Sequence, residues 1–248
     1  MAARPEPRTG GAQAPTRPGG LLSRGLLRTG GPQDGGDATA FLGRVTALDP
    51  AALVRLRDSD GRVTGYARLP FGVLVSRTVN GSVRPADVTV PAADLLGALE
   101  PRQGRAGEVP LPASRDVEWR AALPPMSGWQ RLEEVPGEVV RSLVRAGADA
   151  LRAVPPGVAT SAGESLLDHE ALTVSAAGRT VAVPMRVLTA LARMGFLGAS
   201  AGGGGAGGGG APSADLVVVS AAGGWVRLAA AYGSAYHRRQ PGLGLSPR

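Results

Sequence analysis

The chain has 248 residues, contains no cysteine, and all 27 of its Lys+Arg residues are arginine. Thiol catalysis, disulfides and cysteine-ligated metal centres are therefore excluded, as are a Walker-type phosphate loop and a Schiff-base lysine. Much of the net charge of +7 lies near the two ends, so the body of the chain is close to neutral. No apolar run suits a signal peptide or a membrane span, and we expect a soluble, cytoplasmic protein without a cofactor.

Composition divides the chain into a folded body and segments of low complexity. Residues 1–40 are rich in glycine, proline and arginine and predict a disordered tail, and residues 238–248 predict a second, basic tail. The body, residues 41–237, is expected to be one domain whose halves, 41–100 and 166–237, are joined by 101–165. The glycine-rich residues 198–213 predict a flexible insertion.

The first half shows two hairpin patterns followed by a short helix. Segments 53–57 and 62–69 flank an Asp-Ser-Asp-Gly turn sequence at 58–61. Segments 71–79 and 82–90 flank Asn80-Gly81, a dipeptide that favours the positive φ angles of a tight turn. Residues 91–99 then predict a short helix that begins at a proline.

The longest helical pattern covers residues 135–154. Its apolar positions form one stripe, its other side is charged, and Pro155 and Pro156 end it. At about 1.5 Å per residue it would span a small domain, so we expect a long central helix on which both halves pack.

The second half repeats part of this order. Segments 172–176 and 179–183 predict a hairpin, and residues 184–196 predict a helix. Val88–Pro91 and Val181–Pro184 are both expected to be strands that turn into helices at a proline, which indicates either an internal repeat or a coincidence among common residues. Residues 215–220 and 225–231 flank Gly223-Gly224; a helix also fits 225–236, but the paired glycines favour strands.

Hairpins with few helices indicate the fold class. We expect an α+β protein with a mostly antiparallel sheet, a long central helix and two shorter helices, arranged as two hairpin–helix halves if the repeat is real. The pattern contains too few strand-then-helix units for a Rossmann domain, and the glycine-rich run follows a helix and precedes a strand, which is the reverse of a dinucleotide-binding loop.

The best candidate binding site precedes the long helix. Its residues are Trp119, Arg120, Pro124, Pro125 and Trp129. Two tryptophans around a stiff Pro-Pro pair, in a chain with few aromatic residues, suit a peptide-binding or stacking face. The alternative is that both tryptophans fasten this crossover segment onto the sheet.

Four motifs carry a resemblance to a family. They are WRxxLPPxxGW at 119–129, VPxxVVRxLVRAG at 135–147, ALxRMGFL at 190–197 and YGSAY at 232–236. Together they resemble uncharacterised actinobacterial proteins over about residues 41–245. The resemblance implies no catalytic residue and no partner.

Catalytic and metal motifs are weak. His169 stands between Asp168 and Glu170, but neighbours in sequence seldom face each other and no nucleophile elbow is present. With two histidines and no cysteine, no motif designates a metal site. The hypotheses are therefore, in order, a non-enzymatic protein-interaction or regulatory module, a weak nucleic-acid binder that uses its arginine-rich ends, and an unrecognised hydrolase that uses His169.

Overall fold

The computed structural model describes residues 25–102, 107–176, 178–198 and 215–239. Five α-helices lie within these ranges: α1 Pro32–Leu48, α2 Ala92–Leu99, α3 Gly137–Arg152, α4 Ala159–Asp168 and α5 Met185–Arg193. Short 3₁₀ helices are η1 Glu100–Arg102, η2 Asp116–Glu118 and η3 Pro156–Val158. The strands are β1 Leu26–Thr29, β2 Leu53–Ser59, β3 Arg62–Arg68, β4 Leu74–Arg84, β5 Asp87–Pro91, β6 Glu108–Pro110, β7 Gln130–Pro136, β8 Glu170–Ala176, β9 Arg179–Pro184, β10 Leu216–Ala222, β11 Trp225–Ala230 and β12 Gly233–Arg238.

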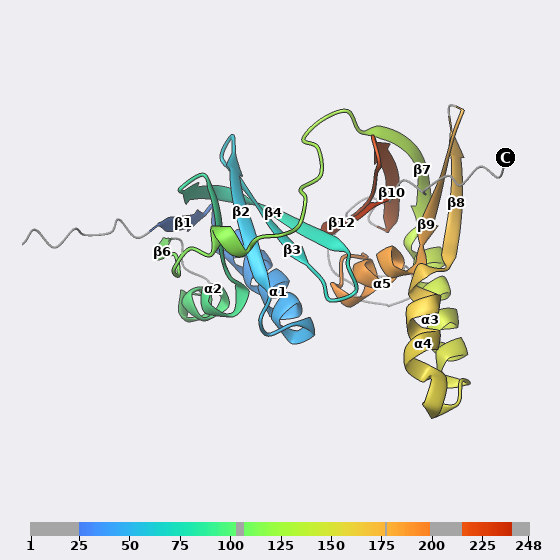
Figure 1. Cartoon of the computed structure of the whole chain (residues 1–248). Helices are drawn as coiled ribbons and strands as arrows, with labels where there is room; N and C mark the ends of the chain where they lie inside the picture. Colours follow the sequence, from blue (N-terminus) through green and yellow to red (C-terminus); the bar gives the residue numbers. More distant parts are fainter. Residues whose placement is uncertain (1–24, 103–106, 177, 199–214, 240–248) are drawn as a thin grey trace, which may run out of the picture.

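One sheet runs through two units. Its order is β5-β2-β3-β4-β12-β11-β10-β7, with β1 beside β4 and β6 beside β1, and β8 with β9 forms a separate hairpin. The first unit contains β1 to β6 with α1 and α2, and the second contains β7 to β12 with α3 to α5. They join where Leu74–Ser76 of β4 pairs with Ser234–Tyr236 of β12. In Figure 1 the helices of both units lie below the strands, so the sheet has one helix-covered face.

The main core lies between the sheet and the helices. In β2 and β3 the side chains of alternate residues, such as Val54, Leu56 and Val63, are buried against this layer. Phe41 of α1 stacks on Phe196, which follows α5, with the ring centroids 6.3 Å apart. The core therefore continues from the first unit into the second beneath the β4–β12 seam.

The expected class is confirmed, because every strand pairing in the described residues is antiparallel and helices accompany the sheet. The hairpins at 53–69 and 172–183 are present as β2–β3 and β8–β9. The helices at 91–99 and 184–196 are present as α2 and α5. Residues 225–230 form a strand rather than a helix, and β12 follows it.

The hairpin expected at Asn80-Gly81 was wrong. Strand β4 runs through this dipeptide to Arg84, and β5 pairs with β2 rather than with β4. Gly81 pairs with Thr29 of β1, and a Cβ atom on Gly81 would lie 2.1 Å from the carbonyl oxygen of Arg28. The glycine is therefore needed for the close approach of β1 and not for a turn.

The expected tail over residues 1–40 was too long. Residues 1–24 lie outside the described ranges, but β1 begins at Leu26 and α1 at Pro32. Pro32 suits the first turn of a helix, and Phe41, Leu42 and Val45 are buried at helical spacing. The two glycines and the alanines near the start of α1 masked this period in the sequence. The expected insertion at 198–213 and the tail at 238–248 lie mostly outside the described residues.

The helix at 137–152 exists but is not central. In Figure 1, α3 and α4 stand at the end of the second unit that lies away from the first, and α3 packs on α5 and α4. Of its residues only Gly137, Val140 and Gly147 are buried. The many charged residues of α3 are typical of a helix with one side in solvent. Part of its apolar stripe is covered by α4, a helix that the sequence did not predict.

A strand turns directly into a helix at a proline in three places. Pro91, Pro136 and Pro184 precede α2, α3 and α5 with extended backbone angles. The sequence had indicated two of these. The third follows β7, so α3 belongs to the second unit. We had expected residues 101–165 to join the two halves, but the boundary between the units lies in the segment before β7.

Candidate functional site

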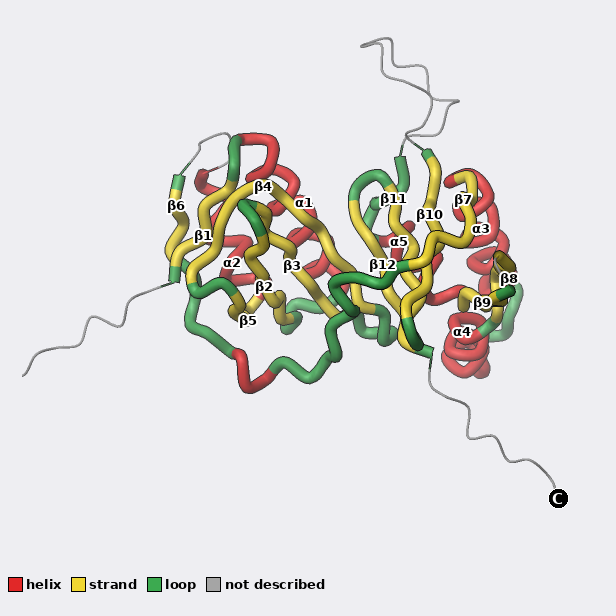
Figure 2. Tube along the Cα trace, turned by 90° about the horizontal axis from the view of Figure 1, so that it is seen from above, coloured by secondary structure: helices red, strands yellow, loops and turns green. Residues whose placement is uncertain are grey.

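The segment 111–129, here called the linker, joins the two units across the face of the sheet that the helices leave open. Figure 2 shows it running, with η2, from the first unit past β12 to β7. Successive side chains of a strand point to opposite faces, so Tyr66 points away from the core that surrounds Ala67. Tyr66, Leu74 and Tyr236 form a second apolar cluster on this face, and the linker packs on it.

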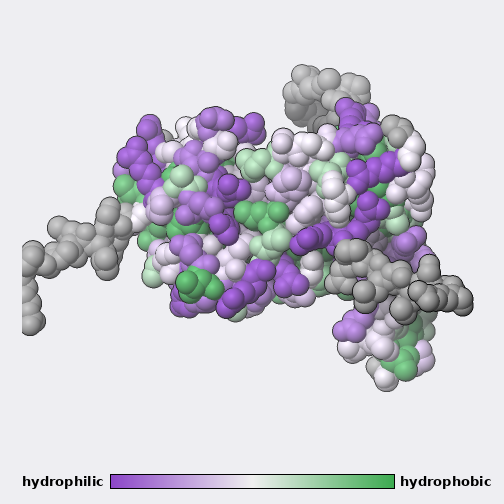
Figure 3. All heavy atoms as spheres, turned by 45° about the horizontal axis from the view of Figure 1, so that its top comes forward, coloured by the Kyte–Doolittle hydropathy of each residue, from purple (hydrophilic) through white to green (hydrophobic). Residues whose placement is uncertain are grey.

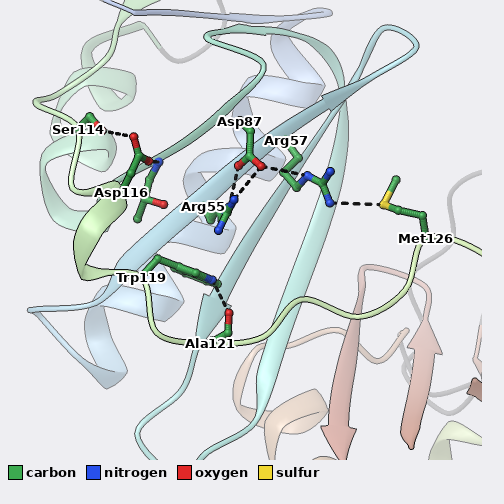
Figure 4. A network of polar contacts seen from close by, with 9 residues as sticks. Arg55, Arg57, Asp87, Ser114, Asp116, Trp119, Ala121 and Met126 are labelled. Atoms are coloured by element: carbon green, nitrogen blue, oxygen red, sulfur yellow. Dashed lines mark hydrogen bonds and ion pairs between the residues drawn. The ribbon is translucent and has the colours of Figure 1, made fainter. Parts of the chain in front are cut away.

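The linker is attached to β5 through Thr89. The backbone N–H of Arg115 donates to the carbonyl of Thr89 at 2.8 Å, and the N–H of Thr89 donates to the carboxylate of Asp116 at 2.5 Å. The hydroxyl of Ser114 donates to the same carboxylate (Figure 4). This hydroxyl, followed by Thr89 and the charge of Arg55, lowers the pKa of Asp116 below its usual value, although burial opposes the shift.

An ion-pair group on the exposed face meets the linker further along. Asp87 of β5 accepts hydrogen bonds from Arg55 at 2.7 and 2.8 Å and pairs with Arg57 at 3.5 Å. Nη1 of Arg57 contacts the sulfur of Met126 at 3.7 Å (Figure 4). Met126 is itself 65% exposed. The linker thus contacts the first unit at Asp116 and again at Met126.

Both linker tryptophans lie against the aromatic cluster. The ring of Trp129 is 5.9 Å from that of Tyr236, and the guanidinium of Arg227 lies 4.6 Å from the Trp129 centroid. Indole Nε1 of Trp129 donates to the carbonyl of Pro125, and that of Trp119 donates to the carbonyl of Ala121. This packing is the arrangement expected of residues that fasten the linker to the sheet.

The five residues singled out in the sequence therefore occupy different positions. Trp119 and Trp129 are half-buried, Pro124 is buried, and Pro125 and Arg120 are exposed. Arg120 lines a cavity beside the linker, and it is this cavity that the sequence could not reveal.

The cavity, here called the junction pocket, has a volume of about 710 Å³ and opens at the seam between the units. It is lined by the first unit, the linker and the second unit; the residues are Arg68, Gly72, Leu74, Arg120, Ala121, Ala122, Asp168, Arg186, Trp225, Tyr236, His237 and Arg238. Its volume is in the range of ligand-binding clefts. On the face of the molecule shown in Figure 3, hydrophilic and apolar residues are interspersed, without one broad apolar patch.

Arg186 connects the walls of this pocket. Its Nη1 donates to the carbonyl of Phe71 at 2.7 Å, its Nη2 pairs with Asp168, and its Nε is buried with no partner among the described residues. Burial lowers the pKa of His237 below its ordinary value, and the charge of Arg186 lowers it further while Asp168 opposes the shift. The imidazole of His237 is therefore expected to be neutral at pH 7.

The geometry around His169 does not support an acid–base pair. His169 follows α4, its side chain is exposed, and its backbone carbonyl accepts from the N–H of Met185. The hydroxyl of Ser161 donates to the carbonyl of Val158 rather than to a base. Within the described residues no group of three metal-ligating side chains occurs, and no helix is long and apolar enough to cross a membrane.

The helices bear on the nucleic-acid hypothesis. The five described α-helices carry seven acidic residues and six arginines, so the helical layer has almost no net charge. Binding to a phosphate backbone requires a concentrated positive surface. The arginine-rich ends proposed for this role lie mostly outside the described residues.

Solved structures define the class of fold. The β sliding clamp of Caulobacter crescentus, in a structure with PEG bound, matches with a TM-score of 0.51 and 14% identity over 88% of this chain and 66% of that chain. A sliding clamp from Bartonella birtlesii bound to griselimycin matches with a TM-score of 0.51 and 11% identity over 88% and 66%. The DNA polymerase III β subunit of Thermotoga maritima matches with a TM-score of 0.51 and 11% identity over 86% and 64%. The chain spans slightly less than two thirds of each clamp, and the likeness shows a clamp-like α+β fold.

The domain families agree with the two units. Residues 23–121 match the domain of unknown function DUF8010, and residues 124–242 match the domain of unknown function DUF8185. The boundary between them falls within the linker. No curated protein matches the sequence. Both domain families are uncharacterised, in agreement with the expected resemblance to proteins of unknown activity.

Proposed function

We propose that this chain is a non-enzymatic protein-interaction module, and that a segment of a protein partner binds at the junction pocket. The observation that carries the proposal is that both units and the linker contribute residues to the lining of one cavity. A ligand there contacts both units at once, so its binding is coupled to how they sit against each other. The clamp-like fold is compatible with this role but does not specify the partner.

The linker residues have supporting roles in this proposal. Trp119 and Trp129 hold the linker against Tyr236 and Leu74, which keeps Arg120 and its neighbours at the rim of the pocket. Two apolar side chains elsewhere on the linker are also exposed, Val117 at 84% and Met126 at 65%. In the segment 119–129, a partner would therefore contact exposed residues such as Arg120 and Ala122, while the two tryptophans hold the segment in place.

The absence of cysteine from the sequence allows a direct test. Ala122→Cys places one thiol at the pocket, and Ala150→Cys places one on the exposed side of α3. Each purified variant is coupled to a short photo-crosslinker and irradiated in extract of the source cells, and adducts are identified by mass spectrometry. We expect one discrete protein adduct with Ala122→Cys that is lacking with Ala150→Cys. The same adducts from both positions, or none from position 122, would refute the proposal.

A further inference from the structure

Arginine dominates the charge of the junction pocket. Four arginines line it, and Asp168 is the one carboxylate among the lining residues. Asp168 is already paired with Arg186. Within the described ranges no carboxylate lies at ion-pair distance from Arg68, Arg120 or Arg238. The pocket thus has an excess of positive charge that its own walls do not neutralise.

Two of these guanidiniums lie close together around Gly72. A Cβ atom on Gly72 would lie 3.4 Å from Nη1 of Arg186 and 3.9 Å from Nη2 of Arg68. The two nitrogens are therefore separated by no more than the sum of these distances. Like charges this close repel each other, and an anion between them would relieve the repulsion through charge-assisted hydrogen bonds.

Contacts within the protein hold the side chain of Arg186 in place. Its side chain is 20% exposed, and its two terminal nitrogens are engaged by Phe71 and Asp168. Its Nε, in contrast, is buried and lacks a partner in the described residues. Because Phe71 and Asp168 hold its two terminal nitrogens, the guanidinium has a fixed orientation at the wall of the pocket.

The remaining walls are apolar and aromatic. Leu74 and Tyr236 are buried, Trp225 is half-buried, and Ala121 and Ala122 of the linker line the same pocket. A cavity of about 710 Å³ exceeds what a single phosphate or carboxylate fills. Guanidiniums beside aromatic rings suit a short peptide that combines carboxylates with an apolar side chain.

The ends of this chain do not provide such a peptide. Residues 1–24 contain Glu6 and four arginines, and residues 240–248 contain one arginine and no acidic residue. Charge complementarity therefore favours another molecule over the chain's own ends.

We infer that the junction pocket binds an acidic peptide segment of the partner, with a carboxylate between Arg68 and Arg186 and an apolar side chain against Trp225 and Tyr236. This inference rests on the proposed function, because it names the chemistry of the segment that the pocket receives. Arg120 and Arg238 at the rim attract the segment and make its binding depend on salt.

The test uses the full chain and one defined probe. The probe is an N-acetylated decapeptide with a central leucine-phenylalanine pair flanked by four glutamates on each side, and its control has glutamine in place of every glutamate. Binding is followed by tryptophan fluorescence and by NMR of the two histidines. We expect the acidic peptide to bind saturably and to raise the pKa of His237, because a nearby carboxylate favours the imidazolium.

Variants at the two ends of β3 provide the matched control. Arg68→Glu reverses a charge in the pocket, whereas Arg62→Glu reverses an exposed charge at the other end of the strand. We expect on the order of tenfold or greater weakening for Arg68→Glu and less than about twofold change for Arg62→Glu. Equal effects of the two variants, equal binding of the glutamine peptide, or no saturable response at millimolar peptide would overturn the inference.

Two further outcomes separate this inference from the proposed function. If inorganic phosphate reproduces the His237 response and the acidic peptide does not bind, the pocket is a free-anion site and the inference is wrong. If the peptide fails while Ala122→Cys still captures a discrete partner, the acidic segment is wrong and the protein-interaction role remains. Failure of the crosslinking arm as well would remove both.

Discussion

Nη1 of Arg186 on α5 donates a hydrogen bond of 2.7 Å to the carbonyl of Phe71, and so connects the second unit to the turn between β3 and β4 of the first. The same guanidinium pairs with Asp168 at the end of α4. One side chain thus links both units and forms one wall of the junction pocket.

Arg186→Ala should loosen this connection. The variant leaves the Phe71 carbonyl and Asp168 without their partner, and we expect a loss of about 1–3 kcal/mol in the free energy of unfolding, measured by urea denaturation. Arg193→Ala, an exposed change on the same helix, is the control and should stay within about 0.5 kcal/mol of the unmodified chain. Equal losses in the two variants would show that Arg186 does not hold the units together.

Gly81→Ala should be strongly destabilising even though the residue is not in a turn. The added Cβ would lie 2.1 Å from the carbonyl oxygen of Arg28 and would push β1 away from β4. We expect a cost of about 2 kcal/mol or more and faster amide exchange in β1. Gly97→Ala in α2, where the Cβ meets nothing within 4 Å, should instead stabilise by about 0.5–1 kcal/mol. A neutral effect of Gly81→Ala would mean that β1 does not approach β4 this closely.

Asp116→Asn should change how stability depends on pH. The pKa of Asp116 is lowered in the folded chain, chiefly by the hydroxyl of Ser114, so its charged form stabilises the fold above the unfolded-state pKa of about 4. This contribution is lost as the pH falls through the lower, folded pKa. The difference in unfolding free energy between the unmodified chain and Asp116→Asn should therefore be largest near neutral pH and should shrink below about pH 4.

Ser114→Ala tests the cause of that shift. Removing the hydroxyl should bring the pKa of Asp116 closer to its usual value, so the acid-induced loss of stability should be smaller and should end at a higher pH than in the unmodified chain. A pH profile of Ser114→Ala that overlays the unmodified one would contradict the assignment.

Trp129→Ala should release the end of the linker. It removes the ring that packs on Tyr236 and lies under Arg227, and we expect a loss of about 1–3 kcal/mol with faster proteolysis within residues 111–129. Trp129→Phe should retain part of the packing. Val117→Ala, at a position that is 84% exposed, should change stability by less than about 0.5 kcal/mol. Proteolysis of the linker at an unchanged rate in Trp129→Ala would refute a fastening role.

The sequence predicted correctly those elements in which the turn residues and the spacing of apolar residues indicate the same structure. Asp60 and Gly61 adopt positive φ between β2 and β3, and Pro91 and Pro184 immediately precede α2 and α5. These elements depend on neighbours only a few residues away in the chain. Turn chemistry and apolar periodicity therefore suffice to find them.

The predictions from the sequence were wrong where a residue contacts a segment that is far away in the chain. Asn80-Gly81 has the composition of a hairpin turn, but Gly81 lies against Arg28, and Asp34 accepts a hydrogen bond from the N–H of Asn80. The amphipathic pattern of α3 led us to expect a central helix. In the structure, α3 lies at the end of the molecule and packs its apolar side on α5 and α4. Periodicity identifies which face is apolar and does not identify its partner.

By itself, the sequence determined the α+β class, the antiparallel hairpins, the exclusion of cysteine and lysine chemistry, and the linker as a segment unlike the rest. Only the tertiary structure decided that the linker tryptophans face the sheet and that a pocket forms at the seam. Its walls come from residues as far apart as Arg68, Arg120, Arg186 and Arg238. Nothing in the sequence around any of these arginines marks it as part of a site. They come together because β4 pairs with β12, two strands about 160 residues apart in the chain.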